Sequence, residues 1–258
     1  MKLASYADGS RDGHLVVVSR DQTQAHHATG IATRMQQLLD DWGFIAPQLE
    51  DLAVQLNHGK LRHAFPFEPD KCLAPLPRAY GWAVVDADGG VRREAGGFLG
   101  PHQPLRAVAS AEPALAVIAG DLNAASDAGG ALDALRLLGL AVDWRLDGEL
   151  IATHCAPLAV TPDELGEAWA AGRFQARLVA LHNGSKLDPR DVTAAPGDAL
   201  ARLVRLRALR AGQLAGAALG ALDLTLAPGD SLRLDLKSAD GNTSLFGAID
   251  IDLGSLPA

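Results

Sequence analysis

Two apolar stripes with the period of an α-helix lie in the first quarter of the chain. The first predicts a helix that ends at Gly43, because a glycine after the last apolar position commonly terminates a helix. The second predicts a helix that begins at Pro47, since proline is favoured in the first helical turn. The stripes consist of Ile31, Met35, Leu38, Leu39 and Trp42, and then of Leu49, Leu52, Ala53 and Leu56.

Strand signals lie on both sides of these stripes. Residues 15–19 (LVVVS) form a β-branched run that is typical of a strand. Segments 232–237 and 249–253 alternate apolar and polar residues, which predicts half-buried antiparallel strands. Asn183-Gly184 between two extended segments predicts a two-residue type I′ hairpin.

Prolines, spaced leucines and a capping motif predict a linker and two short helices in the middle of the chain. Four prolines within residues 58–77 predict an irregular linker between a small N-terminal domain and a larger body. Leucines at three-residue intervals over 132–138, followed by Gly139, predict a short helix. Thr161 and Glu164 have the spacing of a capping box, which predicts the start of another helix.

Composition and charge narrow the class of protein. The chain has 258 residues and 48% hydrophobic residues, which is enough for a sizeable globular core. A formal net charge of −8 disfavours nucleic acid and anionic lipid as partners. No signal sequence or membrane span is predicted, so we expect a cytoplasmic protein. Cys72 and Cys155 lack the spacing of a zinc site or a disulfide framework, and we expect reduced thiols.

Two acidic residues are the first candidates for chemistry. Glu112 begins an apolar segment that predicts a strand ending near Asp121, and Asp143 falls in the next predicted strand. The two acids are thus expected at successive strand ends. Carboxylate oxygens are the ligands that Mg²⁺ and Mn²⁺ prefer. The ordinary alternative is one acid at a strand edge and one in a solvated loop.

A histidine and a group of arginines are further candidates. His154 precedes Cys155, but neighbours in a strand face opposite ways, so the alternative to a reactive pair is a structural histidine and a buried thiol. The arginines follow Gly197 in a leucine-rich segment expected to be helical. A phosphate site is one interpretation, and a solvated helix face is favoured because the arginines scatter around the helix. They are Arg202, Arg205, Arg207 and Arg210.

Extended segments of the chain resemble the fumarylacetoacetate hydrolase family. The resemblance implies an α+β fold, with a small N-terminal α/β domain over residues 1–73 and a mixed β-roll body over residues 74–258. It also implies a homodimer, which is the commonest closed assembly. The segments are 10–13 (SRDG), 28–32 (ATGIA), 42–49 (WGFIAPQL), 62–67 (RHAFPF), 73–80 (LAPLPRAY), 160–166 (VTPDELG), 182–184 (HNG) and 244–250 (SLFGAID).

The family's metal site carries over only in part. Its pattern is Glu-x-Glu, an apolar run ending in Gly-Asp, and a third acid about thirty residues later. Glu112 matches the first acid and Asp143 the third, but Ala114 stands at the second. The resemblance therefore implies a residual metal pair at Glu112 and Asp143. We expect no cofactor, with Mg²⁺ or Mn²⁺ bound only if this residual site is active.

Other parts of the family's machinery have no counterpart in the sequence. The Asn-His-x-x-Glu helix turn, whose His-Glu pair is thought to activate water, is missing after Trp82. A lid lysine is missing beyond Asp143, and Gly216 to Gly220 replaces a Gly-Ser-Gly-Thr stretch that contacts substrate. Only Glu112 and Asp143 of the family's site residues carry over.

Two hypotheses of function follow. The first is a non-hydrolytic member of the family, kept for its fold as a binding or assembly protein. The second is an enzyme of altered chemistry (hydrolase, isomerase, decarboxylase or metal-free cyclase) that acts on a small keto acid, with Glu112, Asp143 or His154 as acid or base. A small-molecule ligand is compatible with both. They differ in whether these three side chains converge in a closed pocket with shifted pKa values.

Overall fold

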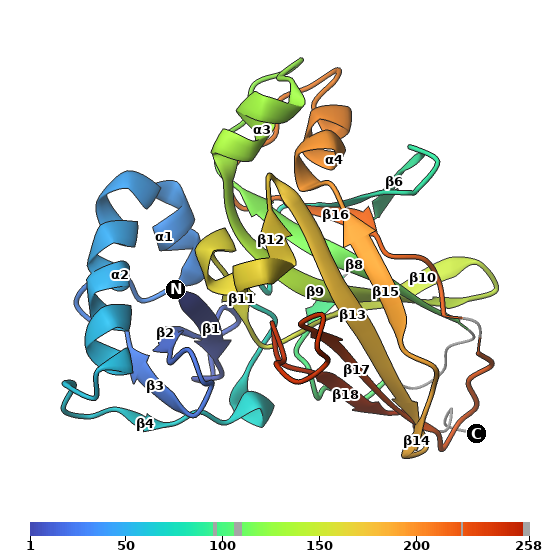
Figure 1. Cartoon of the computed structure of the whole chain (residues 1–258), viewed down its shortest axis with the longest axis horizontal. Helices are drawn as coiled ribbons and strands as arrows, with labels where there is room; N and C mark the ends of the chain where they lie inside the picture. Colours follow the sequence, from blue (N-terminus) through green and yellow to red (C-terminus); the bar gives the residue numbers. More distant parts are fainter. Residues whose placement is uncertain (95–96, 106–109, 223, 255–258) are drawn as a thin grey trace.

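The computed structural model describes residues 1–94, 97–105, 110–222 and 224–254. In Figure 1 a small N-terminal unit lies beside a larger, sheet-rich body. None of the described helices is both long and apolar enough to cross a membrane. The combination of sheets with short, separate helices is the α+β architecture that we expected.

A long sheet passes through both parts of the molecule. Its strands are β1 Lys2–Tyr6, β2 His14–Val18, β3 Gln24–His27, β4 Phe65–Pro66, β5 Trp82–Val85, β6 Val91–Glu94, β7 Phe98–Leu99, β8 Ser110–Ala119, β9 Leu135–Leu146, β10 Glu149–Cys155, β11 Ala159–Val160 and β16 Leu214–Ala218. The order is β4-β3-β2-β1-β11-β9-β8-β16-β5-β6, and β10 pairs with both β9 and β7. Because β1 pairs with β11, the sheet is continuous between the N-terminal unit and the body.

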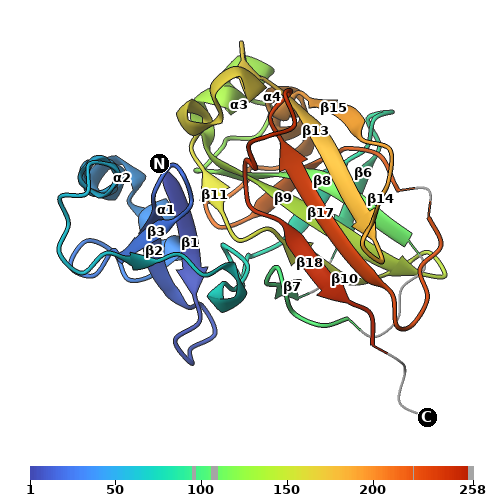
Figure 2. The same ribbon diagram turned by 60° about the horizontal axis from the view of Figure 1, so that its bottom comes forward.

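A smaller sheet packs over the body half of the long one (Figure 2). Its strands are β12 Trp169–Ala170, β13 Arg173–His182, β14 Ser185–Lys186, β15 Arg190–Ala194, β17 Ser231–Lys237 and β18 Ile249–Asp252. The alternating segments predicted as strands are β17 and β18, which pair antiparallel. Asn183 and Gly184 have φ of 51° and 75°, as the predicted type I′ hairpin requires.

The two helices of the N-terminal unit pack on one face of the long sheet, and the two helices of the body pack against each other. They are α1 Met35–Asp40, α2 Trp42–Asn57, α3 Ala128–Ala134 and α4 Pro196–Leu203, with 3₁₀ turns η1 Pro69–Lys71 and η2 Pro162–Ala168. The linker predicted over 58–77 is irregular apart from β4 and η1.

The predicted boundary between the first two helices was wrong. The break falls at Asp41, and α2 begins at Trp42, so Gly43 lies in its first turn and Pro47 lies inside it. Proline lacks the N–H that would bond to the Gly43 carbonyl, and Gly43 is exposed, so that carbonyl is not a buried group left without a partner. The helix therefore tolerates its proline.

Two other predicted helices also differ from the structure. Residues 135–138 continue into β9, because pairing with β8 buries both faces of this apolar run. Thr161 makes no capping bond, and its hydroxyl bonds to the amino group of Met1 at 2.5 Å. Glu164 binds Arg20 instead, and the segment forms a 3₁₀ turn that ends at Ala168.

The long sheet separates two apolar cores. Leu115 and Val117 of β8 face the smaller sheet, whereas Ala116 and Ile118 face the core that includes α1 and α2. Strand alternation explains this division. The second core is lined by small alanines along β8, which leaves room for larger side chains from other elements.

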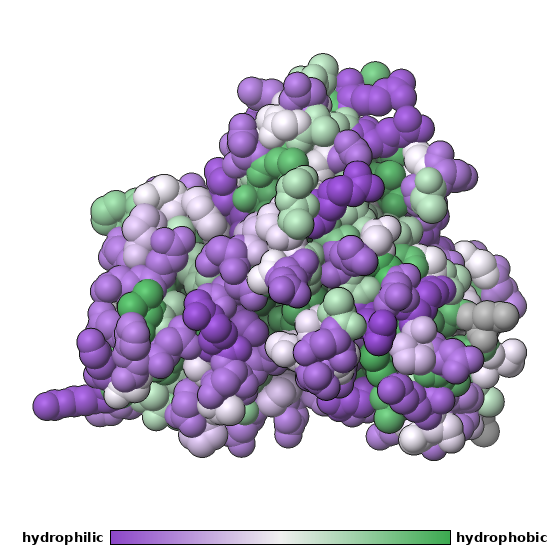
Figure 3. All heavy atoms as spheres, in the orientation of Figure 1, coloured by the Kyte–Doolittle hydropathy of each residue, from purple (hydrophilic) through white to green (hydrophobic). Residues whose placement is uncertain are grey.

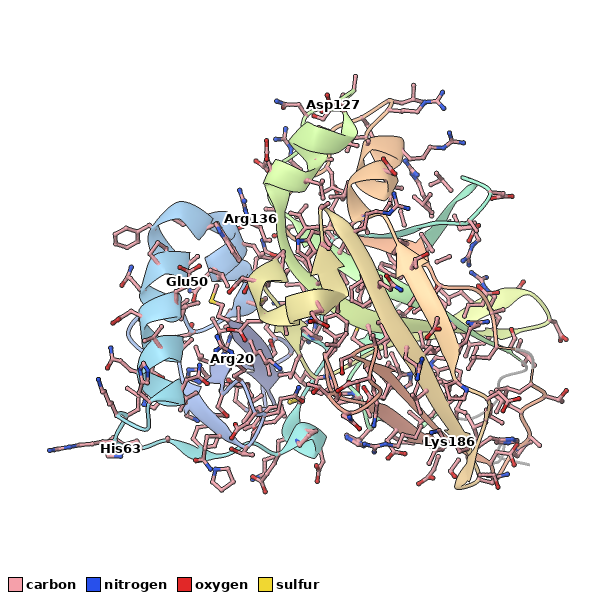
Figure 4. All side chains as sticks on the ribbon, viewed as in Figure 1. Arg20, Glu50, His63, Asp127, Arg136 and Lys186 are labelled. Atoms are coloured by element: carbon pink, nitrogen blue, oxygen red, sulfur yellow. The ribbon has the colours of Figure 1, made fainter. Side chains whose placement is uncertain are left out.

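Side chains also join the N-terminal unit to the body. Figure 4 labels Arg136 and Arg20 on either side of this boundary. Arg136 of β9 lies 5.5 Å from the centre of the Trp42 ring, a cation–π contact. Arg20 reaches Glu164 at 2.9 Å. The face drawn in Figure 3 is mostly hydrophilic, with apolar atoms in small patches.

Candidate functional site

Glu112 and Asp143 lie directly opposite each other on β8 and β9. Residues paired in this way project to the same face of a sheet, so the two carboxylates are neighbours. Both strands are long apolar runs that pair over nearly their full length, which fixes the register. The two acids predicted at successive strand ends are therefore brought together.

Asp143 is buried and hydrogen-bonded. Its residue is only 1% exposed. The indole N–H of Trp82 donates to both carboxylate oxygens, at 2.9 and 3.1 Å, and the Thr153 hydroxyl donates at 2.6 Å. Burial raises the pKa of Asp143 from its ordinary value, while these two donors oppose the rise. The carboxylate is thus enclosed by protein donors.

Trp82 reaches Asp143 because the neighbouring strand carries a glycine. A Cβ on Gly216 would lie 2.6 Å from the Trp82 ring, so only glycine admits the indole there. The Phe98 ring packs edge-on against Trp82, with centroids 6.1 Å apart. Gly216 opens the stretch that departs from the family's Gly-Ser-Gly-Thr pattern. In this protein its role is to accommodate the indole that covers Asp143.

Glu112 has a different environment, made by two arginines. Its Oε2 accepts from Arg92 Nη1 at 2.8 Å and from Arg145 Nε at 2.9 Å. Arg92 also pairs with Asp86 at 2.9 Å. These four side chains line a cleft of about 490 Å³, whose other walls include small residues such as Gly220.

His154 does not join the two acids. It is adjacent to Thr153 on β10 and therefore faces the opposite side of the sheet, towards Trp144. Its Nε2 lies 2.7 Å from the Gln103 carbonyl, and burial lowers the pKa of His154 to about 4. Nδ1 has no partner among the described residues. Cys155 is buried in the core on the other side of the sheet, where burial raises the pKa of its thiol to about 12.

Four residues that engage the two acids were not predicted from the sequence. Arg145 could have been found, because it follows Asp143 by two positions and must share its face of the strand. Trp82, Thr153 and Arg92 could not, since they reach the acids from strands whose pairing is not visible in the sequence.

The described residues around the two acids do not fit a divalent cation. Mg²⁺ and Mn²⁺ need several oxygen ligands that are free to coordinate. The Glu112 carboxylate is shared by two guanidinium groups, and donors from Trp82 and Thr153 occupy Asp143. Among the residues described, no three His, Cys, Asp or Glu side chains group together in a way that could hold a metal.

Comparisons with known proteins agree with this fold. Residues 1–78 match the family model described as fumarylacetoacetase N-terminal domain 2. A search of curated protein sequences gives no match.

Solved structures match over nearly the whole chain. A maleylpyruvate hydrolase from Sphingobium sp. SYK-6, in complex with manganese(II) and pyruvate, has a TM-score of 0.70 at 16% identity, covering 98% of this chain and 100% of its own. A probable 2-hydroxyhepta-2,4-diene-1,7-dioate isomerase from Mycobacterium abscessus has a TM-score of 0.74 at 15% sequence identity. The match covers 100% of this chain and 99% of the isomerase chain. A fumarylacetoacetate hydrolase from Exiguobacterium antarcticum has a TM-score of 0.69 at 15% sequence identity. The match covers 99% of this chain and 100% of the hydrolase chain. The chain therefore matches the fumarylacetoacetase N-terminal domain over residues 1–78, and over nearly its whole length it has the fold of these solved structures.

Proposed function

We propose that this protein is a non-hydrolytic member of the family that binds a small carboxylate ligand, such as a keto acid, without a metal. The observation that carries the proposal is the arginine pair on Glu112. At the position of the family's first metal acid, two guanidinium groups lie 2.8 and 2.9 Å from one carboxylate oxygen. They provide the positive charge that a divalent cation would otherwise supply.

The second support is the enclosure of Asp143. A catalytic or ligating carboxylate must reach the reacting atoms or the metal. Asp143 is 1% exposed beneath Trp82, so a ligand in the cleft would have to displace the indole to touch it. Moving that indole breaks a buried hydrogen bond to an acid, which is costly. Hydrolysis of acylpyruvates or fumarylacetoacetate-like diketones is therefore disfavoured.

The third support is the cleft itself. Its volume of about 490 Å³ is in the range of small-molecule sites. Arg92 and Arg145 bring two guanidinium groups to it, and guanidinium binds carboxylates through paired hydrogen bonds. The structure of the maleylpyruvate hydrolase from Sphingobium sp. SYK-6 contains pyruvate, which makes a small keto acid the first ligand to test.

A divergent enzyme is the second candidate. The position of Glu112 favours this candidate, because its side chain lines the cleft. The carboxylate could leave its arginine partners and accept a proton from a bound substrate. Such an enzyme would act without Asp143 or His154, because the first is covered and the second faces the opposite side of the sheet. Turnover of a bound keto acid that is lost in Glu112→Gln would identify this case.

The test combines binding and turnover. Calorimetric titration with pyruvate should give saturable binding in metal-free buffer, weakened about tenfold by Arg145→Gln, which removes a charged hydrogen-bond donor. The matched control is Arg177→Gln, since Arg177 lies on β13 and pairs with Asp191. Acetylpyruvate should not be hydrolysed with or without Mn²⁺. Metal-dependent hydrolysis that Asp143→Ala abolishes would refute the proposal.

A further inference from the structure

A second pocket lies on the opposite face of the β5–β6 hairpin from Glu112. Arg93 pairs with Ala83 across this hairpin, whereas Arg92 pairs with Val84. Neighbours along a strand point to opposite faces, so Arg92 faces the Glu112 cleft and Arg93 faces away from it. The pocket holds about 180 Å³. It is therefore separated from the cleft of the proposed function by the strands themselves.

The pocket is lined by hydrogen-bond donors and has no acid in its described wall. Arg93 and Arg207 enter it from β6 and from the segment after α4. Gln213 also lines it, and its Oε1 is held by the backbone N–H of Arg210 at 2.9 Å, so its amide N–H₂ group is left to donate. Among the described residues, the Arg93 guanidinium bonds only to the Leu203 carbonyl, at a long 3.5 Å.

The surrounding segment is the most basic part of an acidic protein. The chain has a net charge of −8, yet residues 199–222 contain four arginines and no Asp or Glu. Asp121, from outside the segment, pairs with Arg210 at 3.5 Å. The other arginines of the segment have no carboxylate partner in the described structure. A local excess of positive charge attracts small anions.

The arginines after Gly197 were expected on a solvated helix face because they would scatter around one helix, but the described residues 202–210 do not form such a helix. A single helix over Arg202 to Arg210 would scatter their side chains around its axis. Helix α4 instead ends at Leu203, and residues 204–210 form an irregular turn. Arg202 donates to the Gly89 carbonyl in the β5–β6 turn at 2.8 Å, which places α4 against this hairpin (Figure 1). The turn can thus bring Arg207 to the same pocket as Arg93.

We propose that Arg93, Arg207 and Gln213 form a binding site for a small oxyanion, the phosphoryl or carboxylate group of an anionic metabolite. Two guanidinium groups and one amide supply several N–H donors, and a phosphate or carboxylate supplies mainly acceptors at neutral pH. The pocket volume suits such a group rather than a whole cofactor. This site is independent of the Glu112 cleft.

Calorimetry at low ionic strength, in chloride buffer free of other oxyanions, tests the site with two probes. Inorganic phosphate and acetate are titrated separately, because saturable binding of one and not the other identifies the group that the site prefers. Arg93→Gln and Arg207→Gln should each weaken binding about tenfold, the effect of losing one charged donor. Both arginines are exposed, so the variants should keep the fold, which circular dichroism checks.

Two matched controls separate binding in this pocket from general attraction of anions to a basic surface. Arg205→Gln removes the same charge two residues from Arg207, but Arg205 does not line the pocket, so binding should change less than twofold. The acetate titrations are repeated in the Arg145→Gln background, which weakens carboxylate binding in the Glu112 cleft, so that the remaining binding reports on this pocket. The proposal is overturned if neither anion gives a saturable isotherm, or if Arg205→Gln weakens binding as much as Arg207→Gln.

Discussion

Glu112 and Asp143 are direct partners across β8 and β9, yet the surroundings of the two carboxylates differ. Glu112 is half-buried in the wall of a cleft, and its carboxylate lies between two guanidinium groups. Asp143 is buried, and the indole of Trp82 covers its carboxylate. The charge of the first is balanced by arginines, and the second is held by neutral donors. Each arrangement stabilises an acid in a partly apolar sheet without a cation from solution.

Replacing Trp82 by Phe should destabilise the protein by about 1 to 3 kcal/mol, the cost of leaving a buried polar group with one donor fewer. The control is Trp144→Phe. Trp144 is at least as buried as Trp82, but its indole N–H has no partner among the described residues, so its loss should cost less. Urea unfolding of both variants measures the difference. Equal losses would show that the Trp82–Asp143 bond contributes nothing.

Gly216→Ala should displace the Trp82 ring. The new methyl group would lie 2.6 Å from the ring, and overpacking of this kind typically costs about 1 to 3 kcal/mol. The environment of the indole should change as well, which tryptophan fluorescence detects. Gly43→Ala is the control, because a Cβ there meets no atom within 4 Å and alanine favours the helix. An unchanged melting temperature for Gly216→Ala would contradict the packing seen around Trp82.

Stability should fall as the pH drops from 6.5 towards 4, because of His154. Burial lowers the pKa of His154 from 6.5 to about 4, so the unfolded chain takes up a proton that the folded protein excludes. The contribution of the neutral imidazole to the free energy of unfolding is therefore complete above pH 6.5, and it is lost progressively as the pH falls to about 4. The total is roughly 3 kcal/mol.

The variant His154→Gln isolates this contribution. Urea unfolding at about pH 7 and about pH 5 gives the pH dependence of the wild type and of the variant, and their difference removes the effect of the carboxylates. The wild type should lose more stability than the variant over this interval. Parallel losses would mean that His154 does not titrate as its burial requires.

Ala114→Glu should create a response to Mn²⁺ that the wild type lacks. The substitution restores a third acid on the face that carries Glu112, two positions away on β8. Ala114 is buried, so the new charge should lower the melting temperature, and a bound cation should raise it again by mass action. Thermal unfolding with and without Mn²⁺ measures this. The control Ala114→Gln has the same size without the charge, and an equal response from both variants would refute the prediction.

The sequence alone determined the features that depend on neighbouring residues. The β-branched and alternating segments became β2, β17 and β18, and the Asn183-Gly184 hairpin formed because both residues accept positive φ. The placement of Glu112 and Asp143 on successive strands also followed from two apolar segments in succession, whereas their direct pairing came from the register of β8 and β9. Local alternation along β10 was enough to predict that His154 and Cys155 face different ways.

Tertiary structure decided what the sequence could not. Residues 135–138 became strand because β8 and β11 pair with them, and Pro47 stayed inside α2 although proline usually begins or breaks a helix. The chemistry around the acids depended on strand order, since Trp82 and Arg92 come from the β5–β6 hairpin, which only β16 separates from β8 in the sheet. Side-chain partners across strands are set by which strands pair, and pairing is a property of the whole chain.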